Sequence, residues 1–384
     1  MIGDLLRTEA SGGALGRFTR DLTADARAER LEPVRCRDDE VSRLIDILLR
    51  HGKNNPTLVG PAGVGKTAVA EGFAQRIAAA AVPLALRSVR LLSLDHMALL
   101  AGTTYRGQYE ERLRSIVAET TAARDVILFI DELHNLMGQG TAIGVAMDAA
   151  NMLKPALVRG DFRVIGATTS DEYERWIAAD PALERRFQKV VVRELGEAEA
   201  LEILNARKER LERHHNVLIS DEAILAAVRL TDRHVTDRMR PDKAIDALDE
   251  ACAHLQAVAR YTPRTEGLIR QRLVLLKQAA QREAEDARQE AKPTAEEEFG
   301  PLERFGAELE AFFVGAPAPV GGQRAKAPTV PEPQPSPVMS LAPLEADLAR
   351  SLMEEGIVIR AHDVARVVGL MAGTRVEWEA DAPQ

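Results

Sequence analysis

The sequence predicts an α/β domain, with a parallel sheet of five strands between layers of helices, followed by helical segments. Short apolar runs alternate with longer helical patterns between Leu31 and Glu194, which is typical of such a sheet. The run 126–130 is apolar at every position, as expected of a central strand buried on both faces. Beyond residue 196 the strand patterns end and helical patterns replace them. The predicted strands are 57–60, 88–94, 126–130, 162–168 and 189–193.

The length of 384 residues leaves room for two or three domains. Residues 197–213 and 223–232 have helical patterns, and a third helix begins at Pro241. A charged helical segment follows, and then a proline-rich stretch that we expect to be a disordered linker. The predicted organisation is a lead-in helix and linker at 1–30, an α/β domain at 31–195, a small helical domain at 196–262, a charged helical segment at 263–314, the linker at 315–340 and a C-terminal helical segment at 341–384.

The composition argues against several functional classes. The net charge is −9 and no basic face is evident, which disfavours a nucleic-acid partner. No apolar run approaches the roughly 20 residues of a membrane helix, and residues 1–30 lack the apolar core of a signal peptide. The two cysteines, Cys36 and Cys252, match neither a disulfide framework nor a zinc pattern. We therefore expect a cytoplasmic protein without a membrane partner.

A glycine-rich loop connects the first predicted strand to a helix-prone run. This order suits a nucleoside triphosphate, because glycines let backbone N–H groups converge on phosphate oxygens at a helix N-terminus. Lys66 would reach the β- and γ-phosphates, and Thr67 would offer its hydroxyl to Mg²⁺. ATP and Mg²⁺ are the expected cofactors. The loop consists of Gly60, Pro61, Ala62, Gly63, Val64, Gly65, Lys66 and Thr67.

An acidic pair, Asp131 and Glu132, ends the apolar strand 126–130. Parallel strands deliver their C-terminal residues to one edge of the sheet, where ligands bind. Asp131 would hold Mg²⁺, and Glu132 would polarise a water molecule for attack on the γ-phosphate. An exposed acidic pair without a function is the alternative, and the glycine loop upstream makes it the weaker one.

Three further residues complete the expected catalytic set. Thr169 ends the fourth strand, where a hydroxyl could contact the γ-phosphate or the attacking water; a plain turn is the alternative. Arg185 and Arg186 precede the fifth strand. Paired arginines often form a solvated helix end, but one Lys and one Mg²⁺ leave charge uncompensated in the transition state. An arginine from a neighbouring subunit would supply the missing charge.

Together these motifs resemble the first ATPase module of the Clp unfoldase and disaggregase family, of the ClpA and ClpB type. The resemblance covers about residues 14–260, with a weaker match at 357–374. It implies an AAA+ fold, with a parallel sheet and a helical lid, and a hexameric ring with ATP at the subunit interfaces. The matching segments are 60–67 (GPAGVGKT), 127–132 (ILFIDE), 166–169 (GATT), 183–187 (LERRF), 18–23 in the family's first helix, 53–56, 151–157 and 240–246.

The resemblance also assigns roles to individual residues. Arg185 and Arg186 would act on the ATP of a neighbouring subunit. The segment Pro241-Asp242-Lys243 would line the nucleotide from the lid, and Val34 would contact the base. The family threads polypeptide through the ring's pore with a tyrosine loop. Here that loop carries Tyr105, Arg106 and Gly107, and a tyrosine on a glycine-bounded loop presents a large ring that can contact any polypeptide. A core tyrosine is the alternative, and residues 138–145 would form a second pore loop.

The chain departs from the family pattern in several places. Thr104 stands where a basic residue usually precedes the pore tyrosine, and Arg35-Cys36 stand where the family has Ile-Gly beside the base. We recognise no globular N-terminal domain, no full middle domain and no second ATPase module. A protease partner therefore cannot be inferred. Residues 359–368 resemble the family's bridge to the second module.

Three functions remain open. The leading one is an ATP-hydrolysing module that unfolds or remodels unfolded or aggregated proteins in a homo-hexamer. The second is an ATP-binding scaffold or regulatory subunit that co-assembles with a larger Clp-type relative. The third, a clamp loader or helicase loader, is disfavoured by the acidic balance and by the tyrosine loop.

Overall fold

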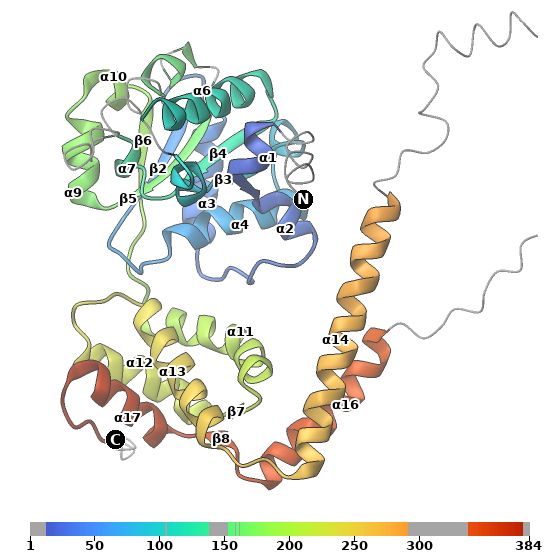
Figure 1. Cartoon of the computed structure of the whole chain (residues 1–384). Helices are drawn as coiled ribbons and strands as arrows, with labels where there is room; N and C mark the ends of the chain where they lie inside the picture. The colour runs from blue at the N-terminus through green and yellow to red at the C-terminus, as the bar shows by residue number, and fades with distance from the viewer. Residues whose placement is uncertain are drawn as a thin grey trace, which may run out of the picture. The chain divides into compact units, whose positions relative to one another are not determined.

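The computed structural model describes residues 13–103, 106–137, 153–157, 159–160, 162–290 and 337–378 (Figure 1). The chain falls into two compact units. The first comprises residues 1–257 and 359–384, and the second comprises residues 258–358. In the described part of the chain, we find no helix with the length and apolar character needed to span a membrane.

The first unit is built on a six-stranded sheet with the order β1-β3-β4-β5-β2-β6. All pairings from β3 to β6 are parallel, whereas β1 pairs antiparallel with β3. The central strands β2, β4 and β5 are buried at every position, and β4 is apolar throughout, as burial on both faces favours. The strands are β1 (Thr19–Asp21), β2 (Asn55–Val59), β3 (Arg90–Leu94), β4 (Val126–Ile130), β5 (Val164–Thr168) and β6 (Phe187–Val191).

The strand β1 was not among the five predicted strands, and it corrects the expectation for this segment. A continuous helix was expected across residues 18–23, but α1 (Ala14–Phe18) and α2 (Leu22–Arg27) are separated by β1. The reason is tertiary, because β1 pairs with the free edge of β3, with Thr19 opposite Leu94 and Asp21 opposite Leu92. The Asp21 carboxylate then accepts from the backbone N–H of Ala24 (2.9 Å) and caps α2.

Helices cover both faces of the sheet. On one face α2, α3 (Asp38–Leu48) and α4 (Lys66–Ala78) share a core with the sheet, and on the other face α1, α5 (His96–Leu100) and α6 (Arg106–Ala122) do so (Figure 1). Because β4, β5 and β2 are adjacent and parallel, their C-terminal ends meet at one edge. The remaining short elements are η1 (Leu84–Leu86), α7 (His134–Met137), α9 (Ser170–Tyr173), η2 (Glu174–Ala178) and α10 (Pro181–Glu184).

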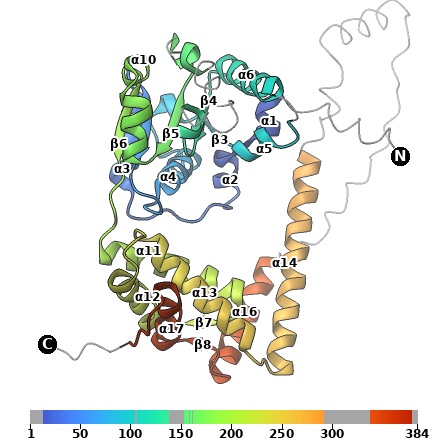
Figure 2. The same cartoon turned by 60° about the vertical axis from the view of Figure 1, so that its left-hand side comes forward.

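A helical lid follows the sheet, with α11 (Glu197–His215), α12 (Asp221–His234) and α13 (Asp242–Val258). The C-terminal helix α17 (Ala361–Ala372) packs against α12 and belongs to the same unit (Figure 2). This differs from the separate C-terminal segment that the sequence predicted. The region also contains a strand that the sequence did not predict, because β7 (Leu218–Ile219) pairs with Ile359 at the end of β8 (Val358–Ile359).

The second unit contains two helices that lie side by side, α14 (Pro263–Glu290) and α16 (Pro337–Glu354). The Glu355 carboxylate accepts from the Thr262 hydroxyl (2.6 Å) and from Thr265, and the Thr265 and Ser351 hydroxyls are 2.7 Å apart. The start of α14 therefore meets the end of α16, and the helices are antiparallel. The predicted linker 315–340 is wrong at its end, because α16 begins at Pro337; residues 315–336 lie outside the described residues.

Candidate nucleotide site

The glycine loop lies between β2 and α4, as the motif predicts. Gly63 (φ +73°) and Gly65 (φ +95°) adopt the left-handed conformation that other residues rarely tolerate. A Cβ atom at Gly60 would lie 2.5 Å from the carbonyl oxygen of Val192, so that position also requires glycine. The loop leads directly into the N-terminus of α4, where backbone N–H groups favour an anion.

Lys66 lies within this loop. Its Nζ donates to the carbonyl oxygens of Gly60 (3.0 Å) and Pro61 (2.8 Å). Burial lowers the Lys66 pKa, and the carboxylates of Asp131, Glu172 and Glu132 oppose that shift. A phosphate in the loop would add further negative charge beside the ammonium and favour its protonated form.

The structure brings Thr67 and Asp131 together from two different elements. The Thr67 hydroxyl donates to Asp131 Oδ2 (2.8 Å), and Asp131 Oδ1 accepts from the backbone N–H of Glu132 (2.9 Å). A hydroxyl beside a carboxylate is a donor set that suits Mg²⁺, which takes its other ligands from water and substrate phosphates. Within the described ranges no cluster of three or more His, Cys, Asp or Glu side chains could hold a metal by itself.

Glu132 faces the same cavity from the turn after β4. Its backbone is left-handed (φ +47°), which is uncommon for glutamate and directs it differently from Asp131. The amide Nδ2 of Asn135 donates to Glu132 Oε2 at 2.7 Å. The carboxylate is thus oriented by a neighbour while it remains exposed to the cavity, as a group that activates water requires.

Thr169 lines the cavity, but its hydroxyl also has a structural partner. It caps α9, donates to Glu172 Oε2 (2.8 Å) and accepts from the backbone N–H of Glu172 (3.4 Å). Burial disfavours the charged form of Glu172, but hydrogen bonds from Thr169 and Thr168, together with the electrostatic effect of the nearby His134, outweigh it and hold the Glu172 pKa below its usual value. Thr169 thus has a structural role as the cap of α9, and its contact with the γ-phosphate or the attacking water stays a prediction.

Sequence reasoning missed several residues that line this cavity of about 480 Å³. Thr168 is buried, and its hydroxyl lies 3.1 Å from Nδ1 of His134. Neither has a motif of its own, although Thr168 is adjacent to the predicted Thr169. The complete set of missed residues that line the cavity is Ala68, Glu71, His134, Thr168, Glu172, Arg207 and Ile245.

The lid contributes Pro241 and Asp242 to this cavity, whereas the third residue of the expected segment, Lys243, is buried and does not line it. A Cβ atom at Gly63 would lie 2.9 Å from both Cβ and Oδ2 of Asp242, so the lid approaches the loop closely. Val34 lies to one side, half-buried, with its backbone N–H donating to Gln75 Oε1 (3.2 Å), and it does not line the cavity.

Arg37 stabilises the glycine loop from outside the cavity, and the sequence analysis did not identify it. Its buried guanidinium donates to the carbonyl oxygen of Val64 (2.5 Å) and to that of Arg193 (3.0 Å). The glycine loop and the chain segment that leaves β6 are therefore held by one side chain.

Arg185 and Arg186 lie outside the cavity of their own subunit. They follow α10, a short helix capped by Asp180, whose Oδ1 accepts from the backbone N–H of Ala182 (2.9 Å). Arg185 is exposed and Arg186 is partly exposed. This placement leaves their side chains accessible to another molecule, while a role in trans stays a prediction.

Comparison with known proteins identifies the same two parts of the chain. Residues 56–195 match the model of the ATPase family associated with various cellular activities (AAA), and residues 196–298 match the model of an AAA lid domain. The chaperone protein ClpB of Mesorhizobium japonicum is 47% identical over 312 residues, which cover 80% of this chain and 36% of that protein. ClpB of Vibrio vulnificus is 43% identical over 370 residues, which cover 95% of this chain and 41% of that protein.

The chain carries a ClpB-like AAA+ ATPase module. It spans 36 to 41% of the length of these relatives. Among solved structures, an S. cerevisiae Hsp104:casein complex matches 64% of the chain and 42% of that chain, with 43% identity and a TM-score of 0.58. An S. cerevisiae Hsp104–ADP complex matches 63% of this chain and 41% of the Hsp104 chain, with 43% identity and a TM-score of 0.59.

The predicted pore loop is described only in part. Tyr105 and the predicted second loop, 138–145, lie outside the described residues. Arg106 begins α6, and Gly107 is exposed in its first turn. The substrate-binding role of Tyr105, Arg106 and Gly107 stays a prediction.

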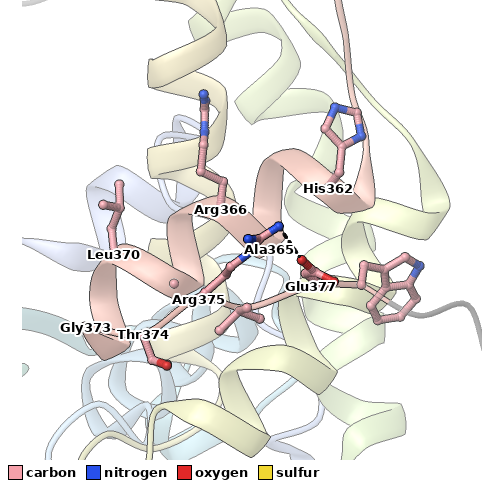
Figure 3. A pocket seen from close by; sticks show the side chains of 11 residues that line it. His362, Ala365, Arg366, Leu370, Gly373, Thr374, Arg375 and Glu377 are labelled. Carbon is pink, nitrogen blue, oxygen red and sulfur yellow. Dashed lines mark ion pairs between the residues drawn. The ribbon is translucent and has the colours of Figure 1, made fainter.

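The module contains a larger cavity, of about 800 Å³, on α17 and the segment that follows it (Figure 3). Figure 3 shows Arg375 and Glu377 of that segment joined by an ion pair of 2.7 Å. This cavity holds neither a glycine loop nor a carboxylate pair at a strand end. The chemistry of nucleotide binding therefore points to the smaller cavity at the phosphate loop.

Proposed function

We propose that this chain binds ATP with Mg²⁺ at the glycine loop and hydrolyses it. The observation that carries the proposal is the convergence of Lys66, Thr67, Asp131 and Glu132 on one cavity. Lys66 and Thr67 begin α4, and Asp131 and Glu132 directly follow β4. Their chemistry covers phosphate binding, metal binding and activation of water.

Each residue has a distinct role in the proposed reaction. Lys66 and the backbone N–H groups at the start of α4 bind and orient the phosphates. Thr67 and Asp131 would hold Mg²⁺, which neutralises phosphate charge when it is bound. Glu132, oriented by Asn135, accepts a proton from the attacking water. Arg185 and Arg186 would complete the site of a neighbouring subunit.

The test is Glu132→Gln, which keeps the size of the side chain and removes its basicity. We expect the rate of phosphate release to fall by roughly 10²-fold or more, while ATP binding persists. The matched control is Glu174→Gln, an exposed glutamate of η2 that lies outside the cavity. Full turnover by Glu132→Gln would show that the catalytic assignment is wrong.

We further propose that hydrolysis drives the threading of protein substrates through a hexameric ring. Casein is part of the complex formed by the similar Hsp104, which supports a polypeptide as the substrate class. Tyr105→Ala is expected to abolish remodelling of an unfolded model protein such as casein and to preserve ATP hydrolysis. Unchanged remodelling would favour the alternative, an ATP-binding subunit that co-assembles with a larger Clp-type protein.

A further inference from the structure

Arg240 lies just before α13 and binds the segment that connects the sheet to the lid. Its backbone N–H donates to Glu194 Oε1 at 2.9 Å, and its Nε lies 3.4 Å from the same oxygen. Glu194 stands between β6 and α11. Partial burial disfavours the charged form of Glu194, but the Arg240 contacts outweigh it and hold the Glu194 pKa below its usual value.

The same guanidinium also binds the lid. Nη1 of Arg240 lies 3.1 Å from Asp232 Oδ2, and the other oxygen of Asp232 lies 2.9 Å from Nζ of Lys243. Lys243 is buried and also donates to the carbonyl oxygen of Val235 (3.2 Å). Glu194, Arg240, Asp232 and Lys243 thus form a continuous chain of alternating charges.

Between Arg240 and Lys243 the chain contains only Pro241 and Asp242, and both of these line the phosphate cavity. Asp242 lies against Gly63 of the loop. Arg240 itself does not line the cavity. Since the residues on each side of this turn are held by ion pairs, the position of the turn depends on those pairs.

We propose that Arg240 is a positioning residue that holds the Pro241–Asp242 turn over bound nucleotide by linking Glu194 to Asp232. Loss of the link would let the turn move away from the loop, so that nucleotide binds more weakly and leaves faster. The chemistry of hydrolysis at Lys66 and Glu132 would be unaffected. This inference rests on the proposed binding of ATP and adds a determinant of affinity outside the cavity.

Two carboxylates on different elements require a branched donor. The guanidinium offers separate N–H groups to Glu194 and Asp232, whereas a lysine ammonium at the same position has a single charged centre. Arg240→Lys should therefore retain part of the effect, and Arg240→Ala should remove it. Glu194→Gln should change affinity in the same direction as Arg240→Ala, because both remove the ion pair between Glu194 and the guanidinium.

The test measures affinity and dissociation of a fluorescent ADP analogue, together with the ATPase rate at saturating ATP. For Arg240→Ala we expect roughly tenfold weaker affinity and correspondingly faster dissociation. The saturated rate should stay within about twofold, and the double variant with Glu194→Gln should be no weaker than either single one. Arg238→Ala is the control, since Arg238 pairs with Asp246 (3.0 Å) on the exposed side of α13.

A thermal unfolding scan of each variant separates local loosening from loss of the fold. Unchanged affinity and dissociation in a folded Arg240→Ala would overturn the inference. So would a lower saturated rate with unchanged affinity, because Arg240 would then act on the phosphates directly. If the wild-type chain bound no nucleotide at all, both the inference and the proposed function would be wrong. If the wild type binds nucleotide and Arg240→Ala binds it equally well, only the inference is wrong.

Discussion

Cys36 shows how one residue can carry backbone strain beside the candidate site. It adopts a left-handed conformation (φ +57°), at the position where the resembling family has glycine. Its Sγ lies 3.4 Å from Glu202 Oε2 of α11. Burial, followed by the hydrogen bond to Glu202, raises the Cys36 pKa to about 11, so the thiol stays protonated and unreactive near neutral pH.

We predict that Cys36→Gly is more stable than Cys36→Ala by about 1 kcal/mol. Both variants lose the contact with Glu202, but alanine keeps a Cβ atom in a left-handed conformation, whereas glycine does not. Urea unfolding of the two variants measures the difference in the free energy of unfolding. An alanine variant as stable as the glycine variant would show that the position carries no strain.

At the scale of elements, α17 is the clearest case of tertiary packing. Its helical pattern is evident from the sequence, yet the pattern does not identify its partner. In the structure Val364 and Val368 are fully buried on this helix, which packs against α12. The backbone N–H of Ser220 also donates to the carbonyl oxygen of Ile359 (3.1 Å). The C-terminal helix is therefore part of the lid.

We predict that Val368→Ala lowers the free energy of unfolding of the lid by roughly 2 kcal/mol, because it leaves a cavity between packed helices. Leu370→Ala on the same helix is the control, since 71% of Leu370 is exposed and its loss should cost less than about 0.5 kcal/mol. Hydrogen exchange across α12 measures both effects. Equal protection of α12 in the two variants would contradict the packing of α17 on the lid.

At the scale of the whole molecule, the position of Arg185 and Arg186 decides how they could take part in catalysis. Arg185 and Arg186 lie outside their own cavity, so a catalytic role requires a second copy of the chain. Such a role is worth about 10³ to 10⁵ in rate where an arginine is supplied in trans. The proposed function therefore depends on assembly.

We predict that two inactive variants restore activity when they are mixed. The double variant Arg185→Ala/Arg186→Ala keeps an intact cavity, and Glu132→Gln keeps intact arginines. In a mixed ring, the arginines of the second variant would complete the cavity of the first. The measurement is the ATPase rate of the mixture against the mean of the separate rates, and light scattering with a slowly hydrolysed ATP analogue checks assembly. A mixture no faster than that mean would argue against a role in trans.

Local sequence patterns were sufficient to predict most strands of the sheet and the main motifs of the candidate site. The five parallel strands could be predicted because each is a short apolar run, and burial of a central strand requires that composition. The glycine loop and the acidic pair could be predicted because their chemistry depends on neighbours along the chain. Thr67 and Asp131 then meet because β2 and β4, on either side of β5, are parallel and end at one edge of the sheet.

Tertiary structure alone decided the remaining features, because they depend on which surfaces meet. The short strand β1 forms because β3 has a free edge, and α17 joins the lid because α12 offers it an apolar face. Arg240 links two carboxylates, Glu194 and Asp232, that lie far from each other in the sequence. Periodicity and motif spacing describe one segment at a time, so contacts between distant segments are set only when the chain packs.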